Sequence, residues 1–219
     1  MTPRDETLAA LGGARIISIL RGDFGDGAED LGEALVEGGL TVMEVSLTSA
    51  DALALVRRLA LRLGTRAVIG VGTVRRVVDC HQAAAAGARF AISPHTRIEL
   101  IAAAHAAGLI AIPGALSPTE VVTALDAGAD AVKLFPADWV GPAGFSSLLA
   151  PLPGVRFVPT GGVTVEKARE YLGRGAWAVG VGSPLVGAGL AAAGGLAGLA
   201  QRARAFAQMA AEAPPFSAS

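Results

Sequence analysis

The sequence is poor in cysteine, aromatic residues and net charge, and each scarcity excludes a class of protein. Its single cysteine, Cys80, has no partner in the chain for a disulfide. Aromatic residues make up 5% of the 219 residues, which leaves little material for stacking nucleic-acid bases. The net charge of −1 gives no general attraction to nucleic acid or to an anionic membrane. These features favour a small-molecule partner.

The sequence also gives no sign of export or of a membrane span. The first residues contain no apolar signal core. Residues 176–200 carry no charge, but they include seven glycines and Pro184. This composition indicates a strand, a glycine-rich turn and the start of a helix rather than one continuous span. We therefore expect a cytoplasmic protein without a membrane segment.

Lysine is the rarest basic residue, and one of the two lysines lies in an apolar run. Of 18 Lys and Arg residues only Lys133 and Lys167 are lysines, and Lys133 lies within the apolar segment 129–136. Burial disfavours the ammonium form, so a lysine enclosed by such a strand has a lowered pKa and can attack a carbonyl to form a Schiff base. Arginine cannot do this because it stays protonated. The alternative is a lysine that extends from the strand end to water.

Short apolar segments alternate with amphipathic ones along the whole chain, which predicts eight strand and helix units. We expect them at 15–20 with 28–38, 41–46 with 50–63, 67–71 with 75–86, 89–92 with 97–107, 109–112 with 118–127, 129–135 with 143–149, 155–159 with 165–173, and 177–181 with 195–211. Most of the strands are apolar on both faces, as in a parallel sheet covered by helices. The prediction is a (β/α)8 TIM barrel forming one domain over residues 1–219, with a polar lead at the start and a disordered tail from about residue 213.

In such a barrel the functional residues lie at the carboxyl ends of the strands. Glu44 shares the inner face of the second strand, where a carboxylate facing a buried amine can move protons. A structural ion pair between Glu44 and Lys133 is the alternative. The third strand ends in Gly72 and Thr73, which offer a close approach and a hydroxyl donor for a carboxylate or carbonyl.

Paired glycines follow the seventh and eighth predicted strands, in 159–164 and 180–183. Glycine leaves the backbone N–H groups accessible, and accessible N–H groups at these two positions are typical of a phosphate site in barrels. The alternative is two glycine turns that bind no ligand. The histidines do not suggest a metal. His81 and His105 fall on predicted helices, where we expect them to be solvated, and only His95 lies near the strand ends. We expect no cofactor and no metal.

With these residues in place, the chain resembles a known family. It is similar to the class I 2-keto-3-deoxy-6-phosphogluconate (KDPG) aldolases, together with the 4-hydroxy-2-oxoglutarate and 2-keto-3-deoxy-6-phosphogalactonate aldolases. The segments that carry the resemblance are 19–21, 37–40, 43–45, 69–74, 92–94, 112–114, 132–137, 159–163 and 182–183.

The resemblance implies a metal-independent aldolase that cleaves KDPG to pyruvate and glyceraldehyde 3-phosphate. It implies a Schiff base on Lys133, with Glu44 as a proton shuttle acting through water, and a homotrimer. In line with the composition, we expect no nucleic-acid partner. The residues expected to bind the substrate are Arg21, Thr73, Pro94, Phe135 and Thr160. The residues expected to bind its phosphate are Gly161, Gly162, Gly182 and Ser183.

One position departs from the pattern of many KDPG aldolases. They have an arginine four residues after the glutamate, where this chain has Thr48, and Arg21 is the residue that can supply the charge. A threonine there is expected to loosen the discrimination between the C4 epimers. The expected epimer is gluconate, because segment 159–162, with Thr160 before the glycines, resembles that branch of the family. Activity on unphosphorylated keto acids is expected to be weaker. The other readings are a metal-dependent aldolase, a thiamine-phosphate-type transferase and a non-catalytic phosphosugar-binding barrel.

Overall fold

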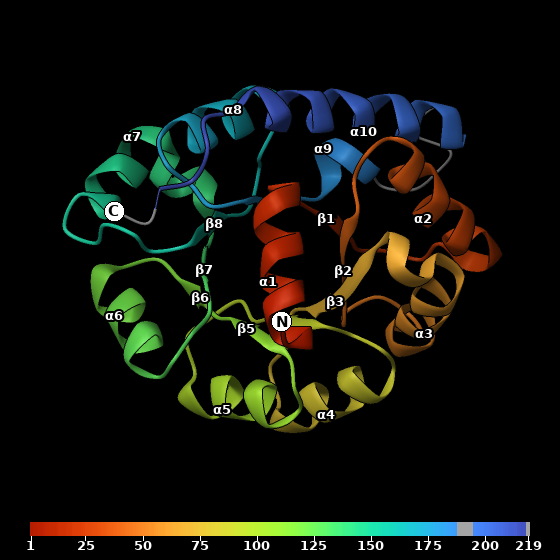
Figure 1. The fold of residues 1–219 in the computed structure, drawn as a ribbon, viewed down its shortest axis with the longest axis horizontal. Helices are drawn as coiled ribbons and strands as arrows, with labels where there is room; N and C mark the ends of the chain where they lie inside the picture. The colour runs from red at the N-terminus through yellow and green to blue at the C-terminus, as the bar shows by residue number, and fades with distance from the viewer. Residues whose placement is uncertain (188–194, 218–219) are drawn as a thin grey trace.

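The computed structural model describes residues 1–187 and 195–217, and its strands form a parallel barrel surrounded by helices (Figure 1). All strand pairings are parallel. The strands are β1 (Ile16–Leu20), β2 (Val42–Ser46), β3 (Val68–Gly72), β4 (Phe90–Ile92), β5 (Ile110–Ile112), β6 (Gly114–Ala115), β7 (Val132–Leu134), β8 (Phe157–Pro159) and β9 (Val179–Val181).

Two hydrogen-bonded groups of strands close into one barrel. One has the order β5-β4-β3-β2-β1-β9 and the other the order β6-β7-β8. Pro113 alone separates β5 from β6, and its carbonyl accepts a hydrogen bond of 2.9 Å from the Lys133 amide, so these two strands are one interrupted strand. A parallel bridge between Thr160 and Gly180 joins β8 to β9. The predicted (β/α)8 architecture is confirmed.

The helices lie outside the strands, largely where the sequence placed them. They are α2 (Ala28–Glu37), α3 (Ala52–Leu63), α4 (Val77–Ala85), α5 (Ile98–Ala106), α6 (Pro118–Asp126), α7 (Ala137–Leu149), α8 (Val165–Gly173), the short α9 (Ser183–Val186) and α10 (Gly195–Glu212). Short 3-10 turns cover Gly25–Gly27 and Gly64–Arg66. Helix α10 packs against both α8 and α2 and so completes the outer layer (Figure 1).

Helix α7 begins six residues earlier than its predicted start at residue 143. It consists of two helical pieces that join at Gly141, whose φ of 64° and ψ of 167° are not helical, and Pro142 follows directly. Glycine tolerates this positive φ without a steric penalty. The predicted helix from residue 143 is therefore the second of these two pieces.

The N-terminal segment corrects our expectation of a polar lead, because it forms the helix α1 (Pro3–Ala14). The Thr2 and Asp5 side chains cap its first turn reciprocally, and Pro3 occupies the first helical position, where its missing N–H costs nothing. Leu11 packs with Ile17 and Phe90 inside the barrel. Figure 1 shows α1 lying across the open end of the strands, so it plugs the amino end of the barrel.

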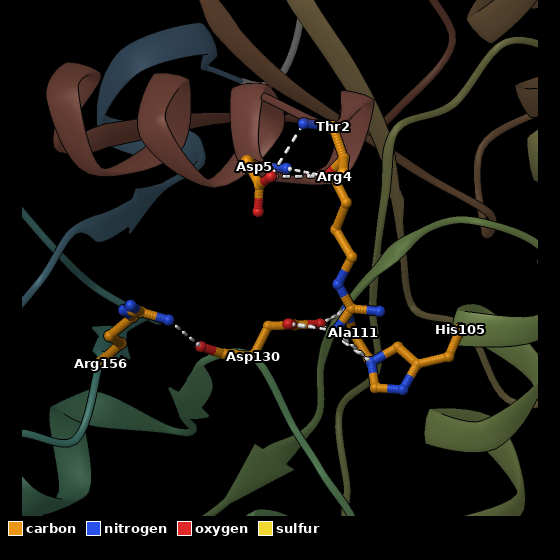
Figure 2. Close-up of polar contacts among 7 residues, drawn as sticks. All are labelled: Thr2, Arg4, Asp5, His105, Ala111, Asp130 and Arg156. Carbon is orange, nitrogen blue, oxygen red and sulfur yellow. Dashed lines mark hydrogen bonds and ion pairs between the residues drawn. The ribbon is translucent and has the colours of Figure 1, made fainter.

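A polar cluster anchors α1 to the barrel (Figure 2). The Arg4 guanidinium and the His105 ring both contact the Asp130 carboxylate, and the His105 Nε2 lies 3.0 Å from the Asp130 Oδ2. Asp130 also accepts a hydrogen bond of 2.8 Å from the Ala111 amide, and its carbonyl accepts one from Arg156. His105 is therefore half-buried and bonded, which corrects the expectation that it is solvated; His81 and His95 are exposed.

The C-terminal end also contacts this face of the barrel. Arg15 donates a hydrogen bond of 2.7 Å to the Pro214 carbonyl, and Phe216 packs against the cluster that contains Leu11. The tail that we expect from about residue 213 includes residues 218–219, which lie outside the described residues. Residues 188–194, within the segment expected to be a glycine-rich turn, also lie outside them. In the described ranges, no helix is long and apolar enough to cross a membrane.

Candidate active site

Lys133 projects into the barrel from β7 and is almost fully buried. Lys133 is 3% exposed, and its register partners are Gly114 on β6 and Val158 on β8. The Nζ atom lies 4.8 Å from the centroid of the Phe135 ring. No hydrogen bond or ion pair of Nζ is found within the described residues. The amine is thus held by packing and by the aromatic ring, as the sequence predicted, rather than extended to water.

Glu44 projects from β2 and is buried to 1% exposure. Neither of its carboxylate oxygens has a hydrogen-bond partner among the described residues. A Cβ atom on Gly72 would overlap the Glu44 carboxylate, so the absence of a side chain at this position makes room for the acid. We had predicted Gly72 as room for a ligand; the structure shows that it first makes room for Glu44.

The two buried groups shift each other's protonation. Burial raises the pKa of Glu44, and the positive charges of Lys133 and Arg21 oppose that rise. Burial lowers the pKa of Lys133, an effect that the Glu44 charge opposes and the Arg21 charge reinforces. Burial is the largest cause in both cases, so the site favours a neutral amine and a protonated acid more than water does.

Glu44 and Lys133 do not form the structural ion pair that was the alternative. No contact within 4.0 Å joins the two charged groups in the part of the chain that the structure describes. A buried carboxylate without a partner is costly, and such groups concentrate at functional sites. The arrangement is that of an acid held close to an amine with its oxygens free to meet a ligand.

Hydrogen-bonded hydroxyl groups follow Glu44 at the ends of β2 and β3. The Ser46 Oγ lies 2.8 Å from the Thr48 Oγ1 and 3.0 Å from the Thr73 Oγ1, and the Arg21 guanidinium donates to the Thr73 hydroxyl over 3.4 Å. Thr73 has a φ of 60°, a left-handed conformation that is unusual for a β-branched residue. Strain of this kind is concentrated at functional sites. The fold thus brings together Thr73 and Arg21, which the sequence named separately as substrate-binding residues.

Ser46 is the residue of this group that sequence analysis missed. It is fully buried and lies two residues after Glu44 on the same face of β2. That spacing was visible in the sequence, but the contact with Thr73 depends on the register that places Ser46 opposite Gly72 on β3. Ser46 fixes the positions of both threonine hydroxyls.

Pro94 and Phe135 both lie near the strand that carries Lys133. The Pro94 carbonyl and the His95 amide pack so closely over Gly114 that a Cβ atom there would overlap them. Because Gly114 is the register partner of Lys133, this places Pro94 beside the lysine strand. Phe135 follows Lys133 by two residues, with its ring next to the amine.

Thr160 is buried at the end of β8. Its hydroxyl donates a hydrogen bond of 3.1 Å to the Val158 carbonyl, and its side chain packs over Gly180, where a Cβ atom would overlap the Thr160 hydroxyl. The bridge between Thr160 and Gly180 brings the ends of β8 and β9 together. The glycine turns that follow, Gly161–Gly162 and Gly182–Ser183, therefore begin at one edge of the barrel.

The turn after Thr160 has the backbone shape expected from its glycines. Gly161 and Gly162 have φ values of 107° and 62°, which side-chain-bearing residues rarely adopt. A Cβ atom on Gly161 would lie 3.5 Å from the Ala137 amide nitrogen and 3.7 Å from the Phe135 ring. Gly162 and Ser183 are exposed, and Gly182 is partly exposed. The residues predicted to bind a phosphate are thus accessible to solvent, and they lie beside β7, the strand that carries Lys133.

No group of three or more His, Cys, Asp or Glu side chains gathers within residues 1–187 and 195–217 in a way that would hold a metal ion. Lys133 instead feels the charges of the Glu44 carboxyl and the Arg21 guanidinium, and Arg21 is linked by hydrogen bonds to the hydroxyl groups of Thr73, Ser46 and Thr48. This set can form a Schiff base, move a proton and bind a carboxylate.

Comparison with known proteins gives consistent matches. A family model described as "KDPG and KHG aldolase" matches residues 8–201. The chain is 34% identical over 178 residues to the probable 2-dehydro-3-deoxy-6-phosphogalactonate aldolase of Rhizobium meliloti, covering 81% of this chain and 84% of that one. It is 38% identical over 167 residues to the 2-dehydro-3-deoxy-phosphogluconate aldolase of Treponema pallidum, covering 74% and 78%.

Solved structures agree. The KDPG aldolase of Zymomonas mobilis ZM4 with 3-phosphoglycerate is 31% identical, with a TM-score of 0.83 over 99% of this chain and 100% of that one. The KDPG aldolase of Legionella pneumophila, with pyruvate captured as a covalent carbinolamine intermediate, is 29% identical, with a TM-score of 0.79 over 98% and 99% of the two chains.

Proposed function

The chain belongs to the KDPG and KHG aldolase family, whose members are carbon–carbon lyases, and we propose that it cleaves KDPG to pyruvate and glyceraldehyde 3-phosphate through a Schiff base on Lys133. The observation that carries the proposal is the buried Lys133 amine close to a buried Glu44 whose oxygens are unpaired within the described residues. Both shifts of pKa suit the chemistry, since one supplies a free amine and the other an acid that can hold a proton.

Lys133 begins the reaction as a nucleophile. Its Nζ attacks the C2 ketone, and loss of water from the carbinolamine leaves an iminium. Glu44, as carboxylate, takes the proton of the C4 hydroxyl while the C3–C4 electron pair moves toward the iminium nitrogen. The aldehyde leaves and an enamine of pyruvate remains.

Glu44 then acts in the opposite sense. The raised pKa of the carboxyl lets it hold the proton from C4 and return it to C3 of the enamine. Hydrolysis of the resulting iminium releases pyruvate and restores the free amine. A bridging water between Glu44 and the substrate is part of the proposal.

The carboxylate of the substrate is assigned to the hydroxyl groups beside Glu44. The hydrogen-bonded Ser46 and Thr73 and the nearby Arg21 offer donors and a positive charge at the same opening. Charge-assisted hydrogen bonds suit a carboxylate. Pro94 and Phe135 line the space around the reacting carbons.

The phosphate is assigned to the glycine turns after β8 and β9. Gly161 and Gly162 have positive φ values, and Gly182 and Ser183 start at the same edge of the barrel. Backbone N–H groups of such turns bind anions. Binding a remote dianion helps orient the reacting carbons, so we expect a higher kcat/KM for phosphorylated substrates than for 4-hydroxy-2-oxoglutarate.

The C4 epimer is the part of the proposal with a direct competitor. Segment 159–162, with Thr160 before the glycines, resembles the gluconate branch and so supports gluconate. The similarity to the Rhizobium phosphogalactonate aldolase supports galactonate, and Thr48, at a position where arginine is frequent, loosens the discrimination between the epimers. Release of pyruvate from each epimer tests the choice: we expect the higher kcat/KM with KDPG, and a clear preference for the galactonate epimer would overturn it.

A thiamine-phosphate-type transferase and a metal-dependent aldolase are two of the alternative functions. The thiamine phosphate pyrophosphorylase of Pyrococcus furiosus is 23% identical with a TM-score of 0.71, a likeness that concerns the fold alone. In the proposed route the iminium accepts the electron pair, so activity should survive EDTA; its abolition would favour a metal-dependent aldolase.

We also propose that the protein assembles as a homotrimer. Trp139 at the start of α7 is 80% exposed, and Ile98 on α5 is also exposed, a pattern suited to a covered surface. One similar solved structure is a protein cage designed by fusing symmetric oligomeric domains, with 32% identity and a TM-score of 0.84. Light scattering should give three chain masses; a monomer would contradict this.

A further inference from the structure

Asp138 and Lys167 form an ion pair beside the glycine turn, and the mechanism above uses neither residue. Asp138 lies in the first turn of α7, five residues after Lys133, and Lys167 lies in the first turn of α8. Lys167 is the other of the two lysines in the chain. Since the remaining basic residues are arginines, a lysine at this place warrants a separate explanation.

The carboxylate of Asp138 lies over Gly162. A Cβ atom on Gly162 would overlap Asp138, with Oδ2 as its nearest atom, whereas Lys167 bonds to Oδ1. The whole carboxylate therefore lies against Gly162, and its Oδ1 atom also binds Lys167. Asp138 thus places a negative charge directly at the turn assigned to the substrate phosphate.

Neighbouring contacts fix this arrangement. The Ala137 amide donates to the Thr160 carbonyl over 2.8 Å, and the Tyr171 hydroxyl donates to the Ala137 carbonyl over 2.9 Å. These bonds tie the start of α7 both to the end of β8 and to α8. The backbone positions of Asp138 and Lys167 are therefore set by the fold, while their side chains, 46% and 40% exposed, are free to change partner.

We infer that Lys167 is a phosphate-binding residue and that Asp138 competes with the phosphate for it. The inference rests on the proposed phosphate site. A dianion at Gly161–Gly162 and the Asp138 carboxylate repel each other, so the carboxylate must move when the phosphate binds. The Lys167 ammonium then exchanges one anion for another, and a surface ion pair is weak enough for this exchange. Lys167 thereby selects substrates that carry a terminal anion.

The test compares Lys167→Met, Asp138→Asn, the double variant and a matched control. Arg169→Met removes one positive charge from the same helix, but Arg169 pairs with Glu212 on α10 at 3.0 Å instead of facing the glycine turn. The kcat/KM values are measured with KDPG and with unphosphorylated 4-hydroxy-2-oxoglutarate. Melting temperatures show that each variant is folded.

We expect Lys167→Met to lower kcat/KM for KDPG by about tenfold, mainly through KM, as for the loss of one charge-assisted hydrogen bond. Asp138→Asn should raise it, and the double variant should lie between the single ones. The unphosphorylated substrate should respond to none of these changes, nor should Arg169→Met affect either substrate. Equal losses with both substrates in Lys167→Met, or no loss with either, would overturn the inference.

Equilibrium binding of inorganic phosphate separates this inference from the proposed activity. We expect weaker binding in Lys167→Met, tighter binding in Asp138→Asn and unchanged binding in Arg169→Met. Equal affinity in all of these proteins overturns the role of Lys167 even when the enzyme cleaves KDPG. Conversely, absence of keto-acid cleavage together with the expected phosphate affinities overturns the proposed reaction and supports the anion site.

Discussion

The reactivity of single residues in the site follows from burial more than from ion pairing. Lys133 and Glu44 are both enclosed, and desolvation is the largest influence on the pKa of each. Desolvation favours neutral forms, and this effect opposes the mutual attraction of the two charges. Burial thus raises the pKa of Glu44 and lowers that of Lys133, the directions that suit an acid and a nucleophilic amine.

The first prediction concerns Glu44→Gln. The amide keeps the shape of the side chain but cannot accept the C4 hydroxyl proton, so kcat should fall on the order of 100-fold or more. The Schiff base with pyruvate should still form, because Lys133 is the nucleophile. Steady-state kinetics measure the first effect and adduct formation the second. Near-normal turnover would reduce Glu44 to a structural role.

The second prediction concerns the pH dependence of adduct formation. The Glu44 charge raises the pKa of Lys133, so Glu44→Gln should lower that pKa and extend adduct formation to lower pH. The Arg21 charge lowers the pKa of Lys133, so Arg21→Met should have the opposite effect and shift the acid limb to higher pH. Trapping rates with pyruvate across a pH series measure both. Shifts of the same sign in the two variants would show that charge coupling is not their cause.

The third prediction concerns Gly72→Ala. The new methyl group would occupy the space of the Glu44 carboxylate, so the acid must move and kcat should fall about tenfold or more. Gly173→Ala is the matched control, because a Cβ atom there has no heavy atom within 4 Å outside its own helix and neighbours. Comparable losses in the two variants would remove the argument for Gly72.

The residues predicted from the sequence were those whose role depends on type and strand position. Lys133 and Glu44 could be found because an ionisable residue in an apolar strand is conspicuous. Ser46 and Asp138 were not predicted as site residues, since their significance depends on contacts with Thr73 and Gly162 that only the fold creates.

At the level of elements, the strands and most of the helices could be predicted because glycines separate apolar segments of different period. Helix α1 could not, because its residues are mostly polar or small and only a few of them face the barrel. Its reciprocal cap at Thr2 and Asp5 is a local signal that was present in the sequence. What that cap could not reveal is the distant anchor at Asp130.

The fourth prediction tests that anchor. Asp130→Ala removes a buried carboxylate that binds Arg4, His105 and the Ala111 amide, so the free energy of unfolding should fall by about 2–4 kcal/mol. Because Asp130 precedes β7 and so lies at the amino end of the strands, the kcat of the folded variant should be unchanged. Denaturant unfolding and kinetics measure the two effects. Full stability would show that α1 is held by its apolar face alone.

At the scale of the whole molecule, closure of the barrel is what creates the site. Glu44 comes from β2 and Lys133 from β7, which lie in different hydrogen-bonded groups of strands. The continuity of β5 with β6 and the bridge between Thr160 and Gly180 join those groups. A fragment that lacks either junction could not bring the acid to the amine.

Borohydride trapping with pyruvate tests the central claim most directly. Since the chain has only two lysines, peptide mapping of the reduced adduct by mass spectrometry identifies the reacting amine without ambiguity. We predict one adduct, on Lys133, that is lost in Lys133→Arg and retained in Lys167→Met. An adduct on Lys167, or no adduct under conditions in which the enzyme turns over, would contradict the account.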